Sequence, residues 1–95
     1  MDLNGIDLSH ADLRGANLSH ADLRDANLSR ADLRGADLVL VDFHSVKLNM
    51  ADCRCANLSG AKFRRLDFNY QDLGGVRLNG VNLSGAEFYM SLIHI

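Results

Sequence analysis

Residues 11–35 read ADLRG-ANLSH-ADLRD-ANLSR-ADLRG, and this five-residue pattern runs through the whole sequence without a change of frame. The chain has 95 residues and therefore divides into 19 pentapeptides. The third residue of the pentapeptide is Leu in 13 cases and Phe in four, with Cys53 and Ile93 in the other two. The first residue is Ala in ten cases, and the second is Asp in ten and Asn in four. Most repeats thus carry a small and a large apolar residue two positions apart.

The five-residue period excludes the two regular secondary structures. On a helix, at about 100° per residue, five residues advance about 500°, so successive Leu residues would form no stripe. In a straight strand, a step of five would place successive Leu residues on opposite faces. The pattern therefore predicts a solenoid that turns once per pentapeptide and directs the first and third residues toward a common axis. Asp, Asn and Gly suit the corners, and the sequence contains no proline to remove a hydrogen bond between coils.

The tandem A(D/N)LXX pattern resembles the pentapeptide-repeat family over the whole chain. The resemblance implies an all-β fold, a right-handed quadrilateral β-helix with four pentapeptides per coil, in a single domain that spans residues 1–95. Nineteen pentapeptides at four per coil would make about 4.75 coils. At a strand spacing of about 4.8 Å per coil, the rod would be roughly 23 Å long.

Residues that are four pentapeptides apart in the sequence would stack in this register. It predicts that Phe43 packs on Phe63 and that Phe68 packs on Phe88. A ladder of outward arginines beside a ladder of carboxylates is also expected; the members are Arg14, Arg34, Arg54, Asp12, Asp32, Asp52 and Asp72. Like charges about 4.8 Å apart repel, so the neighbouring carboxylates favour a solvated, salt-bridged face. A stripe that binds an anion or a partner is the alternative interpretation.

The composition argues against several classes of protein. Ten Lys and Arg against 12 Asp and Glu give a net charge of −2, and 47% of the residues are hydrophobic, so neither a polybasic nucleic-acid binder nor a disordered acidic tail is expected. Two cysteines cannot form a disulfide framework. The sequence shows no apolar run of about 18 residues and no signal peptide. We therefore expect a cytoplasmic protein that does not bind membranes or bind nucleic acid directly.

Residues with catalytic chemistry are scattered over the repeat. The four His residues fall in different columns, so no pair is placed to hold a metal or to act as acid and base. Cys53 would point inward and Cys55 outward, without a base beside either. The Gly residues lie at corner positions and do not form a phosphate-binding loop motif. We expect a protein that is not an enzyme and uses no cofactor or metal.

Two groups of outward residues are candidate interaction surfaces. In the apolar group, one corner column is expected to hold Met50, Tyr70 and Met90, with Tyr89 adjoining it and Val39 and Leu40 on another side. The basic group consists of Lys62, Arg64 and Arg65. Apolar corners on an otherwise polar rod are candidate contacts for a protein partner. Ordinary scatter of surface apolar residues is the alternative explanation.

The C-terminal coil is a third candidate surface. A β-helix leaves unpaired backbone and an open core at each end, and soluble examples cover them with a helix, a loop or another chain. The last pentapeptides stay in frame and are apolar. We expect them to pack against a second copy in an end-to-end homodimer, through Phe88, Leu92, Ile93 and Ile95. The alternative is that the sequence is a fragment of a longer protein.

Two functions of different class are compatible with this sequence. The first is a non-catalytic scaffold for protein–protein interaction, a rigid rod with an as yet unknown protein partner. The second comes from the resemblance, because some members of the family inhibit or protect a type II topoisomerase, DNA gyrase, by imitating duplex DNA. Duplex DNA carries one negative charge per about 1.7 Å, so a 23 Å mimic would need roughly 13 charges. The net charge of −2 therefore favours the scaffold.

Overall fold

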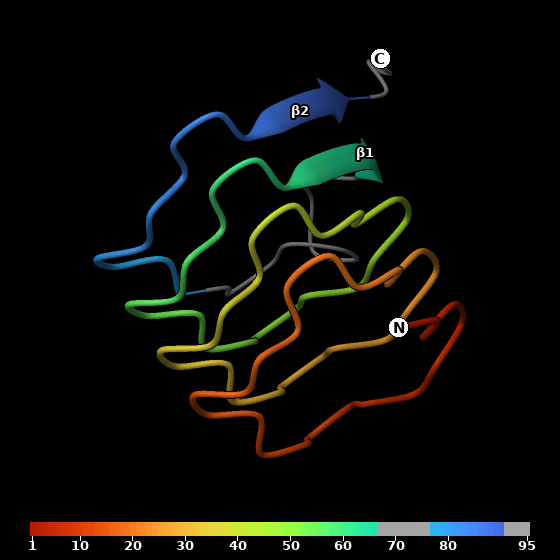
Figure 1. Ribbon diagram of the computed structural model, residues 1–95. Coiled ribbons are helices and arrows are strands. Elements are labelled where there is room, and N and C mark those ends of the chain that lie inside the picture. Colours follow the sequence, from red (N-terminus) through yellow and green to blue (C-terminus); the bar gives the residue numbers. More distant parts are fainter. Residues whose placement is uncertain (67–76, 91–95) are drawn as a thin grey trace, which may run out of the picture.

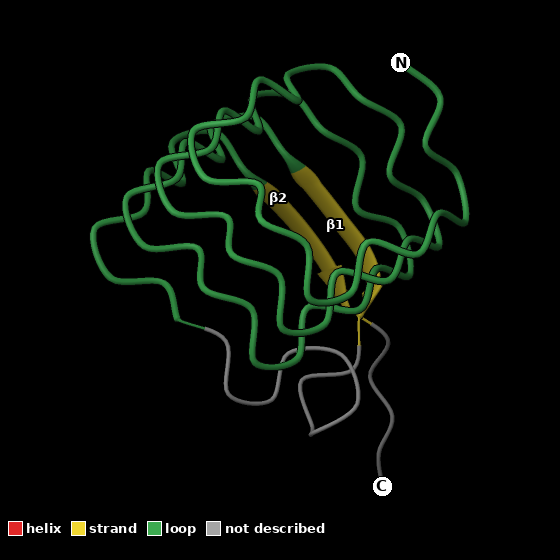
Figure 2. Cartoon of the chain, turned by 90° about the horizontal axis from the view of Figure 1, so that it is seen from below, coloured by secondary structure: helices red, strands yellow, loops and turns green. Residues whose placement is uncertain are grey.

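The computed structural model describes residues 1–66 and 77–90, whereas residues 67–76 and 91–95 lie outside the described part. The chain winds into coils that stack along one axis, and each pentapeptide forms one side of a coil (Figure 1). In the view of Figure 2 the turns of successive coils follow one another around a common centre. The predicted solenoid is therefore confirmed for the described residues.

Parallel pairing between coils uses the second residue of each pentapeptide. Asp2 pairs with Asp22, Asp22 with Asp42 and Asp42 with Lys62, which is an offset of four pentapeptides at each step. Backbone hydrogen bonds flank each pair; for example, the Leu3 N–H donates to the Asp22 carbonyl at 2.9 Å and the Asp22 N–H donates to the Met1 carbonyl at 2.9 Å. Four pentapeptides thus complete one coil from the first residues to Lys62.

The first and third residues of the pentapeptides form the core. Ala26, Ala36, Leu23 and Leu28 are fully buried. Among the residues whose burial the structure describes, no polar or charged side chain is buried. The rings of Phe43 and Phe63 stack with centroids 4.9 Å apart and planes inclined by 12°, as predicted. Such a pair contributes about 0.5–1.5 kcal/mol beyond the burial of its surface.

Each corner is a tight turn across the fourth and fifth residues. The Ile6 N–H donates to the Leu3 carbonyl at 3.1 Å, and the same bond recurs at later corners. The second residue supports the turn, since its Oδ1 accepts the N–H of the fourth residue, as in the 3.1 Å bond from the Asn4 N–H to Asp2. At every described corner outside β1 and β2, the fifth residue lies in the left-handed region, with a φ between 56° and 70°. Eight of these residues are not Gly, and each accepts a conformational strain of about 1–2 kcal/mol.

The described residues contain two regular strands, β1 (Lys62–Leu66) and β2 (Glu87–Met90). They pair in parallel, with Lys62 opposite Glu87 and Phe63 opposite Phe88. Arg64 lies opposite Tyr89 and Leu66 opposite Met90, so the pairing is irregular around Arg65. The other sides of the coils pair through one residue each, because a corner interrupts the extended backbone after three residues.

The stacking offset changes from four pentapeptides to five in the last coils. Asp52 pairs with Arg77, Asn57 with Asn82 and Lys62 with Glu87, which is an offset of five pentapeptides at each step. The expectation of about 4.75 regular coils is therefore wrong beyond residue 62. Insertion of a whole pentapeptide leaves the five-residue frame intact, and for this reason the sequence pattern does not reveal it.

Three predicted neighbours change with this offset. Phe88 pairs with Phe63 and not with Phe68, and Arg77 takes the place beside Asp52 that was predicted for Asp72. Met90 pairs with Leu66, which removes it from the corner column of Met50. Phe68, Tyr70 and Asp72 themselves lie outside the described residues. In the part of the chain that the structure describes, no helix is long and apolar enough to span a bilayer.

Candidate functional site

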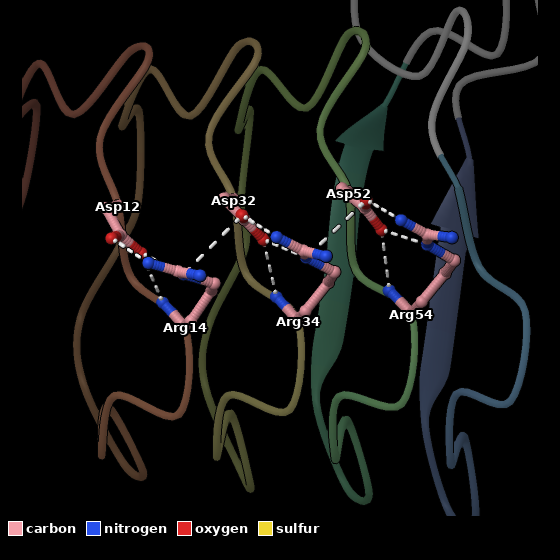
Figure 3. A network of polar contacts seen from close by, with 6 residues as sticks. All are labelled: Asp12, Arg14, Asp32, Arg34, Asp52 and Arg54. Carbon is pink, nitrogen blue, oxygen red and sulfur yellow. Dashed lines mark hydrogen bonds and ion pairs between the residues drawn. The ribbon is translucent and has the colours of Figure 1, made fainter.

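Arginine and aspartate side chains form a continuous ladder on one side of the rod (Figure 3). The Arg14 guanidinium donates from Nε to Asp12 Oδ1 at 2.8 Å and from Nη2 to Asp12 Oδ2 at 2.7 Å. The next two coils repeat this two-pronged geometry. We refer to this set as the Asp–Arg ladder; its members are Asp12, Arg14, Asp32, Arg34, Asp52 and Arg54.

Longer ion pairs join one coil of the Asp–Arg ladder to the next. Arg14 Nε lies 3.8 Å from Asp32 Oδ2, and Arg34 Nε lies 3.9 Å from Asp52 Oδ2. Each of these two arginines therefore has a carboxylate on its own coil and another on the following coil. The predicted salt-bridged face is confirmed for the three coils that carry Arg14, Arg34 and Arg54, and these arginines are largely engaged within the chain.

The ladder lowers the pKa of its carboxyl groups. The hydrogen bond from the Arg14 guanidinium is the main reason that the pKa of Asp12 falls from 3.8 to about 2. The Arg54 guanidinium likewise lowers the pKa of Asp52 to about 2. A similar pair outside the ladder, Arg24 with Asp22, also lowers the pKa of Asp22 to about 2.

Stability should depend on pH in the acidic range. The charged carboxylates have a lower pKa in the folded chain than the ordinary 3.8, so the stability that they contribute is complete above that value and is lost as the pH falls toward about 2. We expect the melting temperature to fall steeply between about pH 4 and pH 2 in a thermal melt followed by circular dichroism. The control replaces Asp12, Asp32 and Asp52 with Asn, which keeps the turn acceptor but cannot titrate. An equal fall in both proteins would contradict the contribution of the ladder.

The last coil breaks the alternation of the Asp–Arg ladder. Arg54 occupies the position of Arg14 and Arg34, but the residue in the following coil is Arg77 and not a carboxylate. The Cys53 N–H donates to the Arg77 carbonyl at 2.9 Å, which fixes the two coils in this register. Two cations thus stand at this end of the ladder, a feature that the sequence alone does not indicate because a coil of four pentapeptides places Asp72 there.

The apolar candidates lie at two different corners. Leu40 and Met50 are each 51% exposed, with φ values of 59° and 61°. Two pentapeptides, half a coil, separate them, so they occupy opposite corners and cannot share one contact surface. Val39 is half-buried beside Leu40. The Leu40 side chain lies over Gly60, since a Cβ added to that glycine would come within 2.6 Å of Leu40 Cδ2.

The basic candidates and the C-terminal candidates meet on β1 and β2. Lys62, Arg64 and Arg65 belong to β1, while Phe88, Tyr89 and Met90 belong to β2 (Figures 1 and 2). The backbone of Tyr89 pairs with that of Arg64, so it does not adjoin Met50 as predicted. The other candidates, Tyr70, Leu92, Ile93 and Ile95, lie outside the described residues.

Sequence reasoning also missed two exposed residues. Leu78 is 43% and Leu83 is 37% exposed, although the third position was predicted to point inward throughout. They stack on Cys53 and Leu58, and no described residue stacks on their other side. The apolar surface of the described chain therefore includes these two core positions.

Potential metal ligands do not cluster in the described residues, and the two cysteines are free thiols. Within residues 1–66 and 77–90, no three His, Cys, Asp or Glu side chains gather into a group that could hold a metal. Burial raises the pKa of the Cys53 thiol to about 12, which keeps it protonated. Cys55 is exposed, at a corner with a φ of 63°.

Solved structures similar to this chain are themselves repeat proteins. The pentapeptide repeat protein Rfr23 from the cyanobacterium Cyanothece 51142 is 34% identical, with a TM-score of 0.47, and the match covers 92% of this chain and 49% of that one. HetL from Nostoc sp. strain PCC 7120, involved in heterocyst differentiation regulation, is 33% identical, with a TM-score of 0.39 and coverage of 90% and 42%. A trypsin-treated QnrB1, a plasmid-mediated fluoroquinolone resistance protein, is 21% identical, with a TM-score of 0.37 and coverage of 86% and 59%. The chain thus spans about half the length of the first two.

A family model described as pentapeptide repeats matches the chain over residues 2–38, 36–69 and 61–91, with eight copies. A comparison with curated protein sequences gave no significant match. The matched residues include the inward Ala and Leu positions, the Asp and Asn turn acceptors and the corners described above. The chain therefore belongs to the pentapeptide-repeat family, whose known structures are right-handed quadrilateral β-helices.

Proposed function

We propose that the protein is a non-catalytic scaffold for protein–protein interaction, a rigid β-helical rod that contacts its partner through the Leu40 corner. The Leu40 corner comprises Val39, Leu40 and the underlying Gly60. The exposed Leu40 in the left-handed region is the observation that carries the proposal.

Two costs make Leu40 an unfavourable choice for a purely structural corner. A left-handed backbone costs a residue with a Cβ about 1–2 kcal/mol relative to Gly. Exposure of half the side chain to water forgoes about half of the stabilisation that full burial of Leu would provide. Gly fills the same corner at Gly60 and Gly85, and therefore the fold itself does not require Leu. A partner that covers the Leu40 side chain would offset both costs.

The proposal extends to pairing between copies of the chain. Phe88 on β2 is one of the residues predicted for an end-to-end homodimer in the cytoplasm, together with Leu92, Ile93 and Ile95. This pairing is a separate expectation, and it is measured by light scattering. A dimer that Phe88→Glu converts to monomer supports it, and a monodisperse wild-type monomer contradicts it.

Replacement of Leu40 with Gly should remove partner binding and leave the fold intact. Relief of the left-handed strain and the added freedom of Gly in the unfolded chain act in opposite directions, so the free energy of unfolding should change by less than about 1 kcal/mol. Tagged wild-type protein, Leu40→Gly and Ser45→Gly are used to capture proteins from nuclease-treated lysate of the source organism. Ser45 is the matched control, because it lies at another left-handed corner with a φ of 56°.

The expected result is a protein that wild type and Ser45→Gly capture reproducibly and that Leu40→Gly loses. Equal capture by all three proteins would overturn the Leu40 corner as the contact. Enrichment of type II topoisomerase subunits, followed by inhibition of DNA gyrase supercoiling, would replace the scaffold with DNA mimicry. No described observation favours that alternative, since in each coil the Asp–Arg ladder neutralises its own carboxylates.

A further inference from the structure

The charge pattern of the Asp–Arg ladder is interrupted at its last rung. In the first coils each arginine is followed by a carboxylate on the next coil, Asp32 after Arg14 at 3.8 Å and Asp52 after Arg34 at 3.9 Å. The same position after Arg54 holds Arg77, because the stacking offset there is five pentapeptides and not four. At the end of the ladder, Arg77 therefore stands at the position where the earlier coils have a carboxylate.

The two arginines at this end have unused donors. Arg54 uses Nε and Nη2 for Asp52, at 2.8 Å and 2.6 Å, and 39% of its side chain is exposed. Arg77 is exposed, and no carboxylate of the described residues lies within ion-pair distance of it. Asp52, the carboxylate whose backbone pairs with that of Arg77, already contacts Arg34 and Arg54. The local charge is therefore positive although the ladder as a whole is balanced.

We propose that Arg54 and Arg77 form a binding site for a carboxylate of an acidic segment in the protein partner. The proposal rests on the proposed scaffold function and names the chemistry of the partner. A Glu or Asp side chain placed here would continue the ladder by one rung, with the planar guanidinium groups as paired donors. Such contacts at an exposed site give modest affinity that falls as salt is added.

The direct test titrates a hexaglutamate peptide into the protein at low salt, with hexaglutamine as the uncharged control. The Nε–H signals of the arginines are followed by NMR. Saturable shifts at Arg54 and Arg77, with smaller ones at Arg14 and Arg24, are expected. An absence of saturable binding, or equal shifts at all arginines, would overturn the site. Inorganic phosphate is titrated in parallel, and phosphate binding as tight as that of the peptide would also overturn a site for an acidic segment.

Arg77→Asp should complete the ladder and abolish the site. The new carboxylate would accept the Arg54 guanidinium and the Asn79 N–H, as Asp52 accepts Arg34 and the Arg54 N–H. We expect hexaglutamate affinity to fall about fivefold or more, while the melting temperature rises. Lys47→Asp is the matched control: Lys47 is an exposed second-position residue with the same charge, but it pairs with Asn27 on a side without a ladder.

The outcomes separate this site from the scaffold function. Weaker peptide binding in Arg77→Asp but not in Lys47→Asp supports the site, and equal weakening in both would show only a general effect of charge and overturn it. A lower melting temperature in Arg77→Asp would contradict the geometry of the ladder end.

If the protein captured through the Leu40 corner binds Arg77→Asp as well as wild type, the site fails and the scaffold stands. If the peptide binds and no protein is captured, the scaffold function fails and the carboxylate site stands.

Discussion

Phe43→Ala will destabilise the fold by about 3–5 kcal/mol, the usual cost of removing a buried aromatic side chain from a core. Phe43 is fully buried, and its ring stacks on Phe63 at a centroid distance of 4.9 Å. The narrow interior of a solenoid has few side chains that can move into the space, since each coil contacts only its neighbours. Urea unfolding followed by circular dichroism measures the loss.

Phe43→Leu is the matched control for this experiment. Leu occupies most other third positions, so the variant keeps the repeat pattern and loses only part of the volume and the ring contact. Its cost should be about 1–2.5 kcal/mol, from incomplete packing and the lost stacking. A loss below about 1 kcal/mol in Phe43→Ala would mean that Phe43 and Phe63 do not pack together in the interior.

Gly80→Cys will form a disulfide with Cys55 and stabilise the oxidised protein by about 2–3 kcal/mol. A Cβ added to Gly80 would lie 3.4 Å from the Cys55 Sγ, which is close to the separation found across a disulfide. Closure of a loop of about 25 residues contributes about 3.5 kcal/mol in the chain-entropy description, and the left-handed backbone at Gly80 subtracts about 1 kcal/mol. Melting temperatures with and without reductant measure the effect.

The same disulfide tests the change of offset between the coils. A constant offset of four pentapeptides would place Gly75, and not Gly80, beside Cys55. Gly75→Cys is therefore the matched control, and it should remain reduced under mild oxidation. The buried Cys53 thiol has its pKa raised to about 12, so it does not compete. If Gly75→Cys formed a disulfide with Cys55 in preference to Gly80→Cys, the stacking offset would be four pentapeptides throughout.

The five-residue period was sufficient to predict most of the architecture. It identified the inward positions, so the burial of Leu23, Ala36 and Phe43 follows from their place in the repeat. The number of sides came from the family resemblance, because the period alone is compatible with three sides or four. The Arg14 and Arg34 rungs were predicted for the same reason, since stacking follows directly once a coil has four sides.

The sequence could not predict where stacking departs from the period. An added pentapeptide preserves every inward and outward position, so no break of pattern marks the change between Lys62 and Arg77. The partner of Phe88 and the end of the Asp–Arg ladder were therefore assigned incorrectly. The corners set a second limit. The repeat predicts that Leu40 points outward, and its side chain is half exposed, but the contact of that side chain with Gly60 does not follow from the pattern.

The direction of the backbone hydrogen bonds determines how the rod responds to mechanical tension. These bonds run from one coil to the next, along the axis, as from Leu3 to Asp22 and from Leu23 to Asp42. Tension applied to the two ends of the chain would load the bonds of the terminal coil first and peel it away before the next coil feels the force. Each regular coil holds four pentapeptides, so the stretched molecule would lengthen in steps of about 70 Å.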